Sequence, residues 1–109
     1  MPTAYIIKFE RPPGGADTSF RSEALAREIA DLNWTATELA LRPLSDYCSP
    51  QFFSSVDGVR TVQSLFREIA AWVPGTKDTT ELLRDLKKCE SILSAAAEHG
   101  VGFHFETSN

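Results

Sequence analysis

Two segments, one near each end of the chain, alternate between apolar and polar residues. Residues 3–10 and 101–106 each place three apolar side chains on one face, and these are Tyr5, Ile7, Phe9, Val101, Phe103 and Phe105. A period of two is typical of a strand with one buried face. Because an isolated strand leaves its backbone groups unpaired, we predict that the two segments pair with each other.

Two longer segments carry apolar residues at every third or fourth position, which is typical of helices with one buried stripe. The first, residues 58–73, ends before Pro74-Gly75 and has on its stripe Val59, Val62, Leu65, Phe66, Ile69 and Trp72. The second, residues 79–99, has on its stripe Leu82, Leu86, Cys89, Leu93 and Ala96. Gly100 follows, where a left-handed residue commonly ends a helix. The short connection between the two segments predicts that the helices pack antiparallel.

The residues between the first strand and these helices have weaker patterns. The apolar spacing of residues 25–32 predicts a helix that stops at Asn33, with Trp34 packing back against it. Residues 35–41 fit either a short second helix or a strand, because they combine a capping-box sequence with alternation. Residues 44–55 lack a period, and we expect a packed connector there.

Taken together, these patterns predict a single, mostly helical α+β domain over residues 1–109. Three or four helices are expected to pack on a small sheet formed by the N- and C-terminal strands. The composition is that of an ordinary globular domain, with 42% hydrophobic and 24% charged residues. No apolar run approaches the ~20 residues that span a bilayer, and the chain does not open like a secretory signal. We therefore expect a cytoplasmic protein without membrane contact, in which Cys48 and Cys89 are free thiols.

The chain is acidic, with eleven Lys and Arg residues, fifteen Asp and Glu residues and a net charge of −4. Its densest basic spot, Arg84, Lys87 and Lys88, is diluted by Asp85 and Glu90 on the same turns. Because affinity for nucleic acid depends on clustered cations, we expect no nucleic-acid partner.

Four residues belong to the types that bind soft metals: Cys48, Cys89, His99 and His104. Their spacing lacks the close pairs of zinc sites, so we expect no metal and no cofactor. Cys89 fits a helix core, and His99 fits a helix C-terminus, where the helix dipole favours a cation. His104 falls on the polar side of the last strand, where we expect it to face solvent beside Glu106.

The densest group of polar reactive side chains lies in residues 45–49, which supports the hypothesis of a small enzyme. A site around Asp46 and Cys48 would use Cys48 as the nucleophile, and such a thiolate needs a nearby base or helix N-terminus. No residue in the pattern serves to orient a base, and ordinary turn chemistry explains the same residues. We therefore favour Cys48 as a buried loop residue and keep the enzyme as the alternative.

Aromatic residues close to this loop favour a contact surface. Asp46, Tyr47, Phe52 and Phe53 are the candidate interaction residues, because aromatics anchor interfaces and two adjacent ones seldom bury equally well. The edges of a small sheet are a second route to a partner, including a homodimer. We predict a non-catalytic protein–protein interaction module, immunity- or antitoxin-like or an adaptor, whose negative charge steers it to a basic partner.

Four stretches resemble a group of small bacterial proteins of unknown function: residues 43–47 (PLSDY), 58–62 (GVRTV), 85–86 (DL) and 100–105 (GVGFHF). The resemblance covers about the last two-thirds of the chain, residues 43–109. It implies a bacterial cytosolic setting. That group has no assigned activity, cofactor or catalytic residue, so the resemblance transfers no functional residue to this chain.

Overall fold

The two terminal strands pair with each other, as their alternation predicts. In the computed structural model, β1 (Ala4–Phe9) and β3 (Phe103–Ser108) run antiparallel, with Ile7 opposite Phe105. Their apolar faces turn toward the helices and form part of the hydrophobic core. The structure describes residues 3–13, 19–71 and 79–108.

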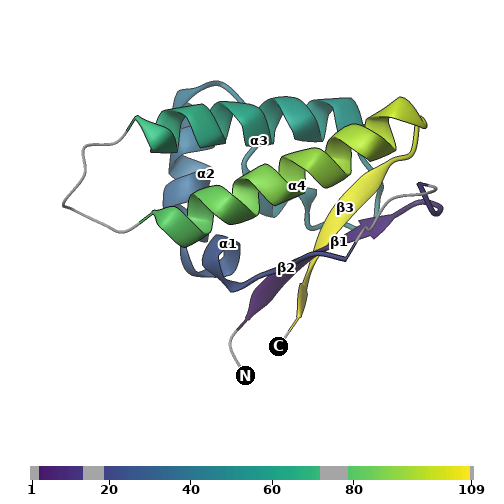
Figure 1. Ribbon diagram of the computed structural model, residues 1–109, viewed down its shortest axis with the longest axis horizontal. Helices are drawn as coiled ribbons and strands as arrows, with labels where there is room; N and C mark the ends of the chain where they lie inside the picture. The colour runs from purple at the N-terminus through teal and green to yellow at the C-terminus, as the bar shows by residue number, and fades with distance from the viewer. Residues whose placement is uncertain (1–2, 14–18, 72–78, 109) are drawn as a thin grey trace.

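The helices lie on one face of the sheet (Figure 1). They are α1 (Glu23–Arg27), α2 (Ile29–Glu38), the 3₁₀ helix η1 (Leu44–Tyr47), α3 (Ser55–Ala70) and α4 (Thr80–Glu98). The predicted α+β class, with helices packed on a small sheet made by the terminal strands, is confirmed. Figure 1 also shows α3 and α4 side by side and antiparallel. The predictions that Trp72 lies on the buried stripe and that the helix ends before Pro74-Gly75 concern residues outside the described ranges.

The stripe predicted for α4 is buried along its whole length: Leu82, Leu86, Cys89, Leu93 and Ala96. The end of the helix also follows the prediction, because Gly100 has a φ of 65°. Gly100 N donates to Ala97 O (3.1 Å) and Val101 N donates to Ala96 O (3.0 Å), which together make a Schellman motif. This turn directs the chain from α4 straight into β3.

A short third strand, β2 (Arg21–Ser22), pairs with β1 and gives the sheet the order β2-β1-β3. The sequence analysis did not predict it. Ser22 also caps α1, since its Oγ accepts from Leu25 N (3.0 Å) and donates to Asp85 Oδ2 (2.6 Å) on α4. One buried serine therefore joins the edge of the sheet to two helices.

The predicted stop at Asn33 is wrong, because α2 continues to Glu38 and the chain turns at Ala40, whose φ is 57°. Asn33 instead uses its side chain to hold η1: Nδ2 donates to Ser45 Oγ (2.9 Å), and Oδ1 accepts from Ser45 N (3.2 Å). Trp34 does not pack back on the helix; it is 66% exposed. Of the two alternatives for residues 35–41, the helix is observed through residue 38.

Helix α3 crosses the sheet very closely at Gly58. A Cβ added there would lie 2.6 Å from the Phe103 ring and 3.0 Å from Leu93 Cδ1. Phe103 is fully buried and its ring stacks on Tyr47 at 5.2 Å, so the ring has no free space to move into. The glycine is therefore what allows α3 to approach β3.

We predict that Gly58→Ala destabilises the protein by about 1–3 kcal/mol, because the overpacking exceeds the gain in helix propensity. Urea unfolding would measure the change in the free energy of unfolding. The control is Arg67→Ala, at an exposed position of the same helix, which should change that free energy by no more than about 0.5 kcal/mol. Equal stability of Gly58→Ala and the wild type would contradict the close approach.

Stability should also fall at alkaline pH. Burial raises the pKa of the Tyr47 phenol above its ordinary 10.0, and burial likewise raises the pKa of the Cys89 thiol above 9.0. Both groups stay protonated in the folded chain after they ionise in the unfolded chain. Their stabilisation is complete below the unfolded pKa values and is lost as the pH rises through the folded ones.

Urea unfolding at about pH 8 and about pH 10.5 would measure this loss. Tyr47→Phe removes one of the two groups and should make the decrease smaller. A free energy of unfolding that is equal at both pH values would contradict the expectation.

Candidate functional site

The irregular segment between α2 and α3 is anchored by Tyr47. Tyr47 is buried, its hydroxyl shares a hydrogen bond with Thr61 Oγ1 (3.1 Å), and its ring packs against Phe53 and Phe103 at 5.1 and 5.2 Å. It was a candidate contact residue, but the structure places it in the core, where it supports its neighbours. Asp46, on the same turn of η1, is exposed.

Phe53 fixes the next part of the segment to the sheet. Its backbone pairs with that of Phe103 through two hydrogen bonds. Phe53 N donates to Phe103 O (2.7 Å), and Phe103 N donates to Phe53 O (2.9 Å). The Arg42 guanidinium lies over the Phe53 ring, 4.8 Å from its centroid, as a cation–π contact. The position of the chain just before α3 is therefore set by backbone bonds and by packing on both sides of the ring.

Phe52 points to the opposite face of the sheet, where its ring lies parallel to His104 at 4.6 Å. The expectation that His104 faces solvent is wrong: it is 7% exposed, because Phe52 covers it. Its Nε2 lies 2.8 Å from Glu106 Oε2, and its Nδ1 lies 3.3 Å from the Gln51 carbonyl oxygen. Both ring nitrogens therefore face oxygen atoms.

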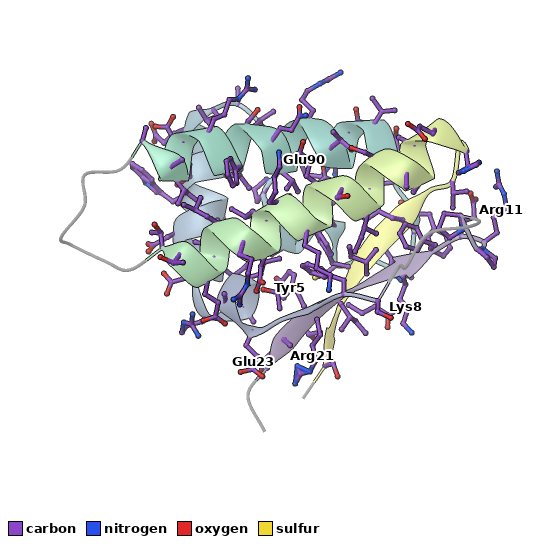
Figure 2. All side chains as sticks on the ribbon, viewed as in Figure 1. Tyr5, Lys8, Arg11, Arg21, Glu23 and Glu90 are labelled. Carbon is purple, nitrogen blue, oxygen red and sulfur yellow. The ribbon has the colours of Figure 1, made fainter. Side chains whose placement is uncertain are left out.

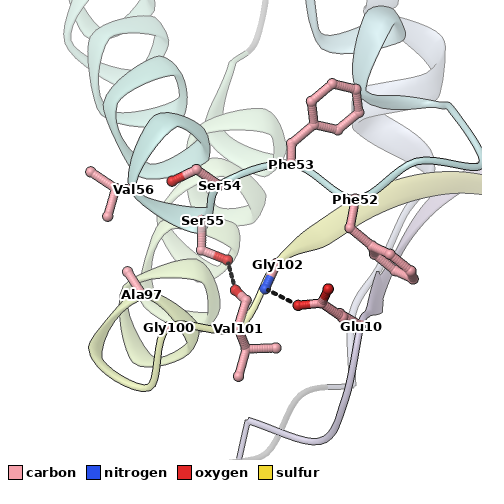
Figure 3. Close-up of a pocket in the computed structure, with 10 residues that line it drawn as sticks. All are labelled: Glu10, Phe52, Phe53, Ser54, Ser55, Val56, Ala97, Gly100, Val101 and Gly102. Carbon is pink, nitrogen blue, oxygen red and sulfur yellow. Dashed lines mark hydrogen bonds between the residues drawn. The ribbon is translucent and has the colours of Figure 1, made fainter.

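Beside Phe52 lies a pocket of about 330 Å³, which we call the Phe52 pocket (Figure 3). It is enclosed by the residues that lead into α3, by the turn from α4 to β3 and by the end of β1. Its lining consists of Glu10, Phe52, Phe53, Ser54, Ser55, Val56, Ala97, Gly100, Val101 and Gly102. Two lining residues are large apolar groups that stay exposed, Phe52 at 43% and Val56 at 54%.

Hydrogen bonds across the pocket hold its walls together. Ser55 Oγ donates to Val101 O (2.5 Å), which joins the start of α3 to the turn after α4, and Gly102 N donates to Glu10 Oε1 (3.4 Å), as Figure 3 shows. Gly102 leaves little room for a side chain, since a Cβ would lie 3.1 Å from Phe53 O and 3.2 Å from Phe52 Cβ. The pocket is therefore formed by the fold itself.

The rim of the Phe52 pocket is polar and carries one ionisable side chain, Glu10. Arg11 Nη1 lies 3.4 Å from Glu10 Oε1 at the surface, which is a weak, exposed ion pair. Ser54 precedes α3 without a side-chain cap bond, so the first N–H groups of that helix lack a capping acceptor. The pocket thus combines an apolar wall with a carboxylate.

Of the lining residues, Phe52 and Phe53 were predicted from the sequence, whereas Glu10, Val56 and Gly102 were not. The sequence could have predicted Gly102, because a glycine inside an otherwise alternating strand often marks a place where another backbone segment approaches closely. Val56 and Glu10 could not be predicted, since neither stands out from ordinary surface residues until the chain is folded.

The structure brings Cys48 next to Tyr5 rather than to a base. Cys48 is exposed as a residue, and the expectation of a buried loop residue is wrong. Its thiol lies against the Tyr5 hydroxyl; partial burial and the nearby charge of Glu106 raise its pKa, although the hydrogen bond to Tyr5 opposes them. Both nitrogens of His104 face other groups. A raised pKa is the opposite of what an activated nucleophile needs.

Within residues 3–13, 19–71 and 79–108, no three His, Cys, Asp or Glu side chains gather as a metal site would require. None of the helices in those ranges combines the length and the apolar character of a membrane span. Cys48 and Cys89 are both free.

Comparison with known proteins returns no match: no family model, no curated protein and no solved structure is similar to this chain. The resemblance of residues 43–109 to small bacterial proteins therefore stays a prediction. What the chain binds has to be inferred from its own surface.

We predict that iodoacetamide alkylates Cys48 more slowly near neutral pH than it alkylates an unstructured cysteine peptide, because the raised pKa leaves less thiolate. The rate should rise steeply at alkaline pH. Cys89, which is buried, should react only when the protein unfolds. Mass spectrometry of the intact protein, with Cys48→Ser to assign the site, would measure both rates. If Cys48 reacted faster than the peptide, the prediction would be contradicted, and the result would support the hypothesis of an enzyme with Cys48 as its nucleophile.

Proposed function

We propose that this chain is a non-catalytic cytoplasmic interaction module that binds a partner protein through the Phe52 pocket. The observation that carries the proposal is the pair of exposed apolar side chains, Phe52 and Val56, at the mouth of a pocket whose walls are already fixed. Exposed aromatic anchors beside a preformed hollow are typical of the centre of a protein interface. A preformed site also avoids the entropy cost of ordering a loop on binding.

The chemistry of the pocket favours a basic partner segment with an apolar side chain. The apolar side chain would enter between Phe52 and Val56, and a neighbouring Lys or Arg would approach Glu10, the one ionisable lining residue. The net charge of −4 would steer such a segment toward the molecule. An immunity- or antitoxin-like protein and an adaptor both fit this description.

The edges of the sheet are weaker candidates than the Phe52 pocket for binding a partner protein or a second copy of the chain. Phe53 already occupies the outer side of β3 at Phe103, and Phe105 is buried. On the opposite side of the sheet, β2 has only two residues, Arg21–Ser22. An added strand would meet Phe53 at one edge and the short β2 at the other, so the pocket is the better candidate.

The test is a pull-down from the source cell with the tagged wild type and three variants. Val56→Arg places a bulky cation in the pocket mouth without touching the core, and Phe52→Ser removes the aromatic anchor. Trp34→Ser is the matched control, because it removes an exposed aromatic from α2, away from the pocket. Circular dichroism and thermal unfolding would show that each variant is folded.

We expect one stoichiometric partner, retained by the wild type and by Trp34→Ser. Titration calorimetry with that purified partner should show binding weakened about tenfold or more by Val56→Arg and by Phe52→Ser. A partner held equally well by Val56→Arg would contradict the pocket as its site. A wild-type protein that is an inert monomer without a partner would remove the basis of the proposal.

A further inference from the structure

A second depression, of about 500 Å³, lies where β1 and β2 meet the side of α4. Ile6 and Lys8 of β1, Phe20 and Arg21 at β2, and Lys88 of α4 contribute to its lining. We call it the basic depression. Figure 2 shows Lys8 and Arg21 on this side of the molecule, below α4 in the view. None of these residues lines the Phe52 pocket, so the two surfaces are independent.

Every ionisable residue that lines the basic depression is a cation. Lys8 and Lys88 form no ion pair within the part of the chain that the structure describes, and Arg21 lies 3.8 Å from the exposed carboxylate of Glu23. Elsewhere on α4 the basic residues are compensated: Lys87, for example, lies 3.5 Å from Glu90. Lys8 and Lys88 therefore give this depression a local positive charge in a chain of net charge −4.

Two carboxylates of the neighbouring elements have partners outside the depression. Asp85, one turn before Lys88 on α4, accepts the 2.6 Å hydrogen bond from Ser22. Glu106, opposite Ile6 on the sheet, lies 2.8 Å from His104 Nε2. Like charges that share one depression repel one another, and a bound anion would relieve that repulsion.

Apolar side chains border these cations, because Ile6 is half-buried and Phe20 is buried at the depression. Its volume lies within the range of small-ligand sites. A dianionic head with an organic body fits this combination best. Arg presents a planar fork that matches two oxygens of a phosphate, and Lys supplies compact point charges beside it.

We infer that the basic depression binds a phosphomonoester. Arg21 donates hydrogen bonds to the phosphate oxygens, and the ammonium groups of Lys8 and Lys88 balance the negative charge of the phosphate. The organic part of the ligand packs over Ile6 and Phe20. The phosphate group would come either from a soluble metabolite or from a lipid headgroup. The experiment below distinguishes these two sources.

Phenyl phosphate is the soluble probe, because it combines a phosphomonoester with an apolar ring. Amide NMR titration of the full chain at about 0.15 M salt should give saturable shifts at Lys8, Arg21 and Lys88, with a Kd of about 1 mM or tighter. Lys88→Gln should weaken binding about fivefold. Lys87→Gln is the matched control, since it removes the adjacent, ion-paired cation and should leave the Kd unchanged.

Cosedimentation with vesicles that contain phosphatidic acid, a phosphomonoester lipid, is the second arm. Binding of phenyl phosphate without cosedimentation assigns the site to soluble phosphomonoesters. Cosedimentation that Lys88→Gln abolishes and Lys87→Gln preserves assigns it to a lipid headgroup. Failure of both probes to bind saturably, or equal losses in the two variants, would overturn the inference.

Discussion

Phe103 contacts the sheet, α3 and the segment before α3 at the same time. Its peptide group bonds to Phe53 on one side, while β3 pairs with β1 on the other. Its ring fills the space that Gly58 leaves at the crossing of α3 and stacks on Tyr47 of η1. One buried residue thus joins the sheet, a long helix and the irregular segment before it. The hydrogen bond from Ser55 Oγ to Val101 O adds a second connection at the start of α3.

The Phe52 pocket follows from these contacts. Because Phe53 is bonded to the sheet, Phe52 must project to the other face, where His104 holds its ring, and Val56 must stand at the start of α3. The pocket is therefore a rigid consequence of core packing, although its two apolar groups lie on the surface. The basic depression has the opposite charge and lies at the other edge of the sheet. The two surfaces would allow one small domain to bind a protein partner and a phosphate-bearing ligand separately.

Local periodicity was sufficient to predict the paired terminal strands, the two long helices and the glycine that ends the second one. It failed where a distant residue decides the local structure. Asn33 lies inside α2 and its side chain bonds to Ser45, and Phe52 covers His104. For the candidate site, adjacency alone indicated that Phe52 and Phe53 would not bury equally. The rest of the pocket comes from segments that meet only in the folded chain, which no local pattern encodes.

The bridge between Phe53 and Phe103 fixes the chain before α3 to the sheet. Native-state hydrogen exchange of these two amides, resolved by NMR, is the measurement that tests this bridge. We expect both amides to exchange only through openings as costly as those of the β1–β3 ladder, close to global unfolding. A Phe53 amide that exchanges at the rate of an exposed loop, while the ladder stays protected, would show that the segment is not anchored. The Phe52 pocket would then not be preformed.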